Sequence, residues 1–148
     1  MDFEQLLHQL VTNSVRFIVA GGVACALNGF VRATEDLHIL VEQSGENLRK
    51  MLKTLLQWGE GHAKELRIED FPLSPGAVRL IEDFPLDIFT VLKEKSYHDL
   101  LPHTLMTETG IPYLDPTSLI ETKRDTQRER DKIDILALES ILSEQDSD

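Results

Sequence analysis

The feature that most constrains the fold of this chain is a switch of hydrophobic spacing near its N-terminus. Apolar residues first recur at helical spacing, which predicts an amphipathic helix over residues 2–13. A β-rich run from Val15 to Val19 follows and stops at Gly21-Gly22, before a small-residue helix over 23–28. Because a strand leads here through a glycine turn into a helix, we expect a fold that mixes the two kinds of element.

The rest of the chain continues the alternation of strand and helix patterns. Further strands are predicted over 36–41, 78–81, 86–91, 105–109 and 111–114. Further helices are predicted after a Ser44 cap up to about residue 56, over 117–124 behind Pro116, and over about 127–142. The strands at 78–81 and 86–91 are close enough in sequence to form a hairpin.

Together these segments predict an α/β or α+β fold in which helices flank a mixed β-sheet. The chain has 148 residues, which suits a single domain over 1–148 with an ordinary buried core. Its C-terminal helices begin at about residue 116, and the acidic end over 143–148 is expected to be a frayed tail.

The charge of the chain excludes several classes of function. It carries 26 acidic and 15 basic residues, a formal charge of −11, and no basic stripe that could neutralise a long nucleic acid. No apolar run approaches the roughly 18 residues of a membrane helix, so we expect no membrane partner. The acidic N-terminus lacks the basic start of a signal peptide, and a single cysteine, Cys25, suits a reducing compartment. We therefore expect a cytoplasmic protein.

Three polar features are candidates for chemistry. Gly21-Gly22 opens a helix, where free backbone N–H groups could meet a phosphate, although a tight connection alone also explains it. Asp36 and His38 project from the same side of a strand, about 7 Å apart along it, and could close on a cation. Asp87 lies between apolar neighbours within another strand, where Asp is uncommon. For each carboxylate alone, an exposed strand face or a capping role is the alternative.

The stretch from Phe17 to Ala24, followed by the segment from Gly29 to Ile39, resembles the minimal nucleotidyltransferase fold of the DNA polymerase beta-like superfamily. The family pattern is a glycine pair that opens a helix, then Gly-x-x-Arg-x-Thr-x-Asp-x-Asp, then a third Asp on a later strand, where Asp87 fits. The C-terminal segments Leu119-Ile120-Glu121-Thr122-Lys123 and Arg130-Asp131-Lys132-x-Asp134 are similar to the family's closing helices.

This resemblance implies transfer of a nucleoside monophosphate from a nucleoside triphosphate to an acceptor hydroxyl on a small molecule or a protein. Carboxylates of the family hold divalent cations, Mg²⁺ or Mn²⁺, which clamp the triphosphate. By the same resemblance Asp36 and Asp87 are catalytic, and Asp36, His38 and Asp87 are the metal ligands. The implied nucleotide-binding residues are Gly21, Gly22, Arg32, Thr34 and Lys123.

One position departs from the family pattern. His38 stands where the second metal-binding Asp belongs, so a neutral nitrogen replaces a charged oxygen. Mg²⁺ prefers oxygen ligands, and His38 should therefore favour Mn²⁺, Zn²⁺ or similar ions. Two interpretations follow. Either the enzyme works with an altered metal arrangement, or the fold has lost its chemistry and acts as a nucleotide-binding or protein-interaction module, for example in a toxin-antitoxin pair.

The remaining polar residues carry weaker signals. Arg32 could instead be an ion-pair partner, and Thr34 could only shape its loop. Lys123 is the one nucleotide contact expected in the C-terminal segment, because the basic residues over 123–132 are matched by acidic ones and a salt-bridged helix surface is the default. Cys25 is expected to be a packed apolar side chain, and the histidines other than His38 are expected to be structural.

Overall fold

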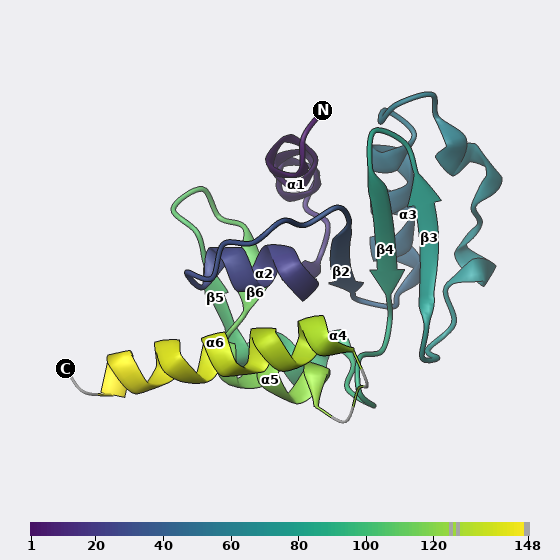
Figure 1. The fold of residues 1–148 in the computed structure, drawn as a ribbon. Helices are drawn as coiled ribbons and strands as arrows, with labels where there is room; N and C mark the ends of the chain where they lie inside the picture. Colours follow the sequence, from purple (N-terminus) through teal and green to yellow (C-terminus); the bar gives the residue numbers. More distant parts are fainter. Residues whose placement is uncertain (125, 127, 147–148) are drawn as a thin grey trace.

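The computed structural model describes residues 1–124, 126 and 128–146 and contains a six-stranded mixed sheet with helices against it (Figure 1). The strand order is β3-β4-β2-β1-β6-β5. The strands are β1 (Phe17–Ala20), β2 (Leu37–Val41), β3 (Ala77–Ile81), β4 (Pro85–Phe89), β5 (Thr104–Met106) and β6 (Pro112–Leu114). The α+β class and the mixed sheet expected from the sequence are confirmed.

Several helices begin after a residue whose side chain accepts a hydrogen bond from one of their free N–H groups, whereas the helix that begins at Gly21 has no side-chain cap. The Asp2 side chain accepts from the N–H of Gln5, Ser44 caps α3, and Asp115 caps α5. The helices are α1 (Phe3–Thr12), α2 (Gly21–Leu27), α3 (Gly45–Leu55), α4 (Tyr97–Leu100), α5 (Pro116–Lys123) and α6 (Glu129–Asp146). Among the described residues, no helix is both long and apolar enough to cross a membrane.

The centre of the sheet joins strands of both directions. β2 runs antiparallel to β1 and parallel to β4, and β3 forms the predicted hairpin with β4. β6 lies parallel to β1 and antiparallel to the edge strand β5. The connection from β2 to β3 carries α3 and a long segment with two short 3-10 turns at His62–Glu65 and Ile68–Asp70.

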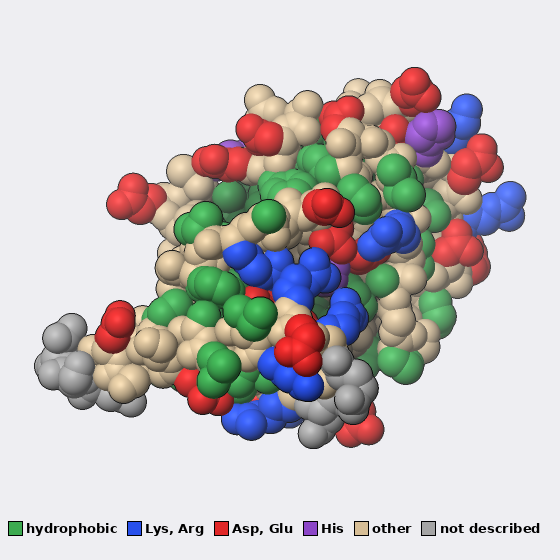
Figure 2. Space-filling model, viewed as in Figure 1, with side chains coloured by type: hydrophobic (Ala, Val, Ile, Leu, Met, Phe, Trp, Pro, Cys, Tyr) green, Lys and Arg blue, Asp and Glu red, His purple; other side chains and the backbone are tan. Residues whose placement is uncertain are grey.

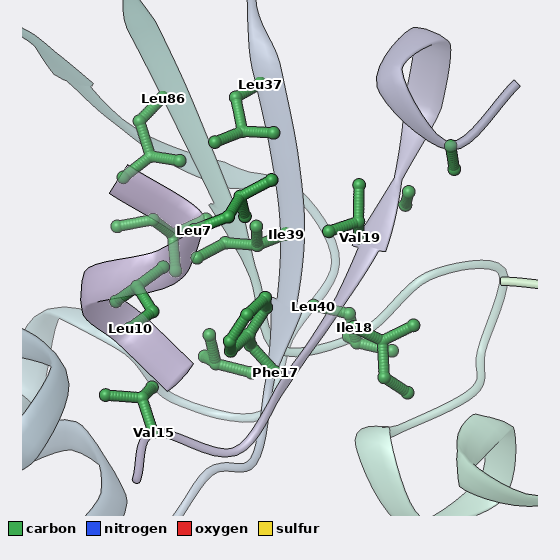
Figure 3. Close-up of a cluster of buried hydrophobic side chains, with 14 of the residues drawn as sticks. Leu7, Leu10, Val15, Phe17, Ile18, Val19, Leu37, Ile39, Leu40 and Leu86 are labelled. Carbon is green, nitrogen blue, oxygen red and sulfur yellow. The ribbon is translucent and has the colours of Figure 1, made fainter. Parts of the chain in front are cut away.

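The hydrophobic core covers both faces of β1 and β2. Leu7 and Leu10 of α1 lie on one side, toward Phe17, and Ile18 points to the other side (Figure 3). Strict alternation along the predicted strand over 36–41 places Leu40 on the outward face with Asp36 and His38; this prediction is wrong, because Leu40 is fully buried. A central strand covered by helices on both faces buries both sets of side chains, so its polar residues lie in a helix-covered region.

The C-terminal part differs from the prediction in its boundaries. The last helix, expected over about 127–142, begins at Glu129 and continues to Asp146, so most of the expected frayed tail is helical. Residues 147–148 of that tail lie outside the described residues. α5 and α6 pack closely against each other, and the final turns of α6 extend past the sheet (Figure 1).

Candidate functional site

The sheet register places four residues in one row across neighbouring strands. Ala20 of β1 pairs with His38 of β2, His38 pairs with Asp87 of β4, and Asp87 pairs with Arg79 of β3. Residues that pair across strands project their side chains to the same face. Asp36, which directly precedes β2, projects to that face as well, so three strands contribute to a single polar cluster.

The side chains of Asp36, His38 and Asp87 converge on one point. The Nε2 atom of His38 lies 2.9 Å from Asp36 Oδ2 and 3.1 Å from Asp87 Oδ2. One ligand atom from each residue lies within 4.8 Å of the other two, and this group could hold a metal ion. Two carboxylates about 4 to 6 Å apart can share a cation.

Arg79 also reaches this cluster, and the sequence analysis assigned it no role. Its Nε donates to Asp87 Oδ1 at 2.8 Å and its Nη2 donates to Asp87 Oδ2 at 2.9 Å. The same Nη2 lies 3.4 Å from Asp36 Oδ2. Such a two-point contact between guanidinium and carboxylate is a strong, directional pair. The signal that could have revealed it is the hairpin itself, since the 78–81 and 86–91 strands place residues 79 and 87 opposite each other.

The Asp36 carboxylate is held in its charged form. Burial acts to raise the pKa of Asp36, but its interaction with His38 and its hydrogen bonds with Asp87 and the backbone together outweigh burial. The pKa of Asp36 therefore lies below its ordinary value of 3.8. Asp36 is ionised at neutral pH, as a metal ligand must be.

The Gly21-Gly22 turn lies directly against the cluster. Gly21 has a φ of +64°, and a Cβ atom there would approach His38 Nδ1 to 2.8 Å. A Cβ on Gly22 would come within 2.9 Å of the side chains of Arg32 and Thr34. Both glycines are thus required by close approach, which brings the predicted glycine turn together with three of the predicted site residues, Arg32, Thr34 and His38.

Arg32 and Lys123, both predicted to contact nucleotide, are held by one buried acid. Arg32 donates to both carboxylate oxygens of Asp134, at 2.8 and 2.9 Å, and Lys123 Nζ lies 2.9 Å from Asp134 Oδ2. Asp134 is fully buried and Lys123 nearly so. This triad ties α5 and α6 to the loop before β2. The nucleotide role of Arg32 and Lys123 stays a prediction, and their ion pairs give both a structural role.

A cleft joins the glycine turn, the Asp36 cluster and the start of α6. Besides the predicted residues Gly21, Gly22, Arg32, Thr34, Asp36, His38 and Lys123, its walls include Phe89, Thr122, Thr126, Arg128 and Arg130. Basic side chains gather near the sheet end of α6, above more deeply placed acidic ones (Figure 2). Arg128 lies 3.6 Å from Asp131, whereas Arg130 makes no ion pair with the residues that the structure describes.

Much of the salt-bridged surface expected around α5 and α6 is present. Arg124 pairs with Glu121 and Lys132 pairs with Glu129. Asp125, another expected partner, lies outside the described residues. Arg130 is therefore the exposed cation best placed to meet an anionic ligand in the cleft, a role that the sequence analysis did not assign.

Comparisons with known proteins add no relative. The chain matches none of the protein-family models and none of the curated proteins with which it was compared.

Replacing Gly21 by Ala should lower the free energy of unfolding by about 2–4 kcal/mol, because a left-handed backbone and a contact with the His38 ring both oppose the added methyl group. The matched control is Gly61→Ala. Gly61 has a similar φ of +76° but its Cβ would come no closer than 3.4 Å to any atom.

Gly61→Ala should therefore cost only the backbone term of about 1–2 kcal/mol in chemical denaturation. The two variants separate backbone strain from displacement of His38. Equal losses of stability in both would contradict the close packing of Gly21 on His38.

Proposed function

We propose that this chain is a nucleotidyltransferase-like protein that binds a nucleoside triphosphate and a divalent cation in the cleft. The observation that carries this proposal is the convergence of Asp36, His38 and Asp87 to within 4.8 Å beside a glycine turn and basic residues. The reaction would transfer the nucleoside monophosphate to an acceptor hydroxyl. The charge of −11 favours a small molecule or a protein as the acceptor over a long nucleic acid.

The donor set fits a divalent cation of intermediate softness. Two carboxylate oxygens and one imidazole nitrogen suit Mn²⁺ better than Mg²⁺, which prefers oxygen alone. A cation bound there would neutralise phosphate charge and lower the pKa of the attacking hydroxyl. Asp36 is kept ionised for this purpose, and the ring of His38 is oriented by Gly21 and by Phe89, whose ring centre lies 5.5 Å away.

The chain's own residues would then divide the remaining work. Arg130 and Arg128 would bind the outer phosphates at the start of α6. Gly21 and Gly22 carry no side chains, which leaves room for the phosphates beside the glycine turn. Asp87 would accept the proton of the acceptor hydroxyl while the oxygen of that hydroxyl attacks the α-phosphorus. The bond from that phosphorus to the bridging oxygen breaks, and pyrophosphate leaves.

A second candidate function is favoured by a specific contact. The two-point ion pair between Arg79 and Asp87 occupies oxygens that a metal would need. If that pair persists, the domain would bind nucleotide or a protein partner without transferring a nucleotide, as one half of a toxin-antitoxin pair could. His38 in place of the family's Asp supports this candidate as well.

Incubation with labelled nucleoside triphosphates separates the two candidates. With Mn²⁺, and less with Mg²⁺, we expect the wild-type chain to transfer label to an acceptor or to itself. The variant His38→Asp should shift the preference toward Mg²⁺, because it restores an oxygen ligand. Transfer by His38→Asp but not by the wild type would favour the non-catalytic candidate. Neither transfer nor nucleotide binding in either protein would contradict both the transfer reaction and nucleotide binding, and would leave protein interaction as the role of the domain.

A further inference from the structure

The Arg79 guanidinium lies where a cation bound between Asp36 and Asp87 would lie. It donates to both oxygens of Asp87 and lies 3.4 Å from Asp36 Oδ2. His38 Nε2 contacts the same Oδ2 atoms of the two acids. The lone pairs that would hold a metal are therefore already used, and a metal ion placed among them would also face the positive charge of Arg79.

The repulsion between Asp36 and Asp87 explains why Arg79 pairs with them. Asp87 is nearly buried, with 9% of its side chain exposed, and Asp36 is 24% exposed. Two carboxylates this close together repel each other unless a positive charge lies near them. Arg79 supplies that charge in the absence of a metal. It can reach the carboxylates because it pairs with Asp87 across the hairpin and projects from the same face of the sheet.

Arg79 can also leave without breaking the core. β3 is an edge strand of the sheet, and 51% of the Arg79 side chain is exposed. Rotation of the side chain would carry the guanidinium into solvent while the strand pairing between β3 and β4 stays intact. Its contacts with Asp87 are thus exchangeable, in contrast to the buried triad around Asp134.

We propose that Arg79 is an internal counter-cation that competes with a divalent metal ion for Asp87 and Asp36. The metal-free protein holds the site closed through Arg79, and metal binding releases the guanidinium. This inference rests on the metal site of the proposed function and adds the residue that sets its metal affinity.

The test measures Mn²⁺ binding by isothermal titration calorimetry, without nucleotide. Arg79→Gln should bind Mn²⁺ about tenfold more tightly than the wild type, because the ion no longer displaces a charge-assisted pair. Arg16→Gln is the matched control, since Arg16 is also an exposed arginine that pairs with a largely buried acid, Glu42, outside the site. Both variants change the net charge equally. Arg79→Lys keeps the charge but loses the two-point contact, so its affinity for Mn²⁺ should lie between those of the wild type and Arg79→Gln.

Thermal unfolding supplies a second readout that does not depend on activity. Without metal, Arg79→Gln should melt at a lower temperature than the wild type, because Asp36 and Asp87 then repel each other. Saturating Mn²⁺ should raise the melting temperature of Arg79→Gln by more than it raises the melting temperature of the wild type.

Three results would overturn the inference. They are equal Mn²⁺ affinity in Arg79→Gln and Arg16→Gln, weaker binding in Arg79→Gln, and no Mn²⁺ binding in any of the proteins. Failure of the proposed function has a different signature. If Arg79→Gln binds Mn²⁺ more tightly but no variant transfers labelled nucleotide, the competition stands and only the transfer reaction falls.

Discussion

Replacing Asp134 by Ala is expected to lower the free energy of unfolding by about 3–5 kcal/mol, the usual cost of removing one partner from a buried ion pair. Asp134 is fully buried, accepts hydrogen bonds from Arg32 and forms an ion pair with Lys123. Without it, the ammonium of Lys123, itself 8% exposed, stays buried, and Asp131 at 3.6 Å is its remaining ion-pair partner among the residues that the structure describes. The loss should loosen α5 and α6 from the loop before β2.

Urea denaturation followed by circular dichroism measures this loss. Asp134→Asn is the second variant, because it keeps the shape of the side chain and removes only the charge; it should destabilise the fold less than Asp134→Ala. Glu139→Ala, on an exposed position of the same helix, should change stability by no more than about 0.5 kcal/mol. A loss below about 1 kcal/mol in Asp134→Ala would contradict the importance of the triad.

The same triad predicts a pH dependence. Burial raises the pKa of Asp134, but the hydrogen bonds and charges of Arg32 and Lys123 outweigh it, so the pKa lies below its ordinary value of 3.8. A lowered pKa in the folded state means stability that is fully present above the unfolded value and is lost as pH falls through the folded one. Wild-type stability should therefore fall below about pH 4, and Asp134→Asn should show a shallower fall. Parallel curves would contradict this assignment.

Replacing Asp36 by Asn should have the largest effect on the proposed site. We expect the affinity for Mn²⁺ in the presence of a nucleoside triphosphate to fall about a hundredfold or more, since removing even an outer partner of a metal ligand costs about 10- to 100-fold. The substitution removes a ligand charge and weakens the contact that orients His38. Transfer of labelled nucleotide, where the wild type shows it, should fall to background.

Glu35→Gln is the matched control for Asp36→Asn. Glu35 is the preceding residue, is exposed, and is not among the residues that line the cleft. It removes the same charge one position away, so calorimetry should give wild-type affinity. Equal weakening by both variants would show that overall charge, and not coordination, determines binding.

The sequence predicted most elements of the fold because their signals are local. Ser44 and Asp87 illustrate this, since one caps α3 and the other lies within β4 as expected. The strand over 15–19 is shifted to Phe17–Ala20, and the helix after the glycines begins at Gly21 itself. Differences of one or two residues in the boundaries of an element are smaller than apolar spacing alone can resolve.

The chemistry of the cleft was harder to predict because it depends on which strands and helices meet. The choice of Asp134 as the partner of Arg32 joins residues 102 positions apart, and no local pattern contains it. No role is predicted for Arg79 from the sequence, although its pairing with Asp87 follows from the hairpin register. Leu40 was misassigned because alternation assumes one covered face, whereas β2 is covered on both.

The proposed function requires that Asp36, His38 and Asp87 jointly coordinate a divalent cation. Electron spin echo spectroscopy of bound Mn²⁺ tests it most directly, with inorganic tripolyphosphate replacing the nucleotide so that no ligand nitrogen interferes. We predict modulation from one imidazole ¹⁴N in the wild type and its loss in His38→Asp with Mn²⁺ still bound. Bound Mn²⁺ without nitrogen modulation in the wild type, or modulation that persists in His38→Asp, would contradict the claim.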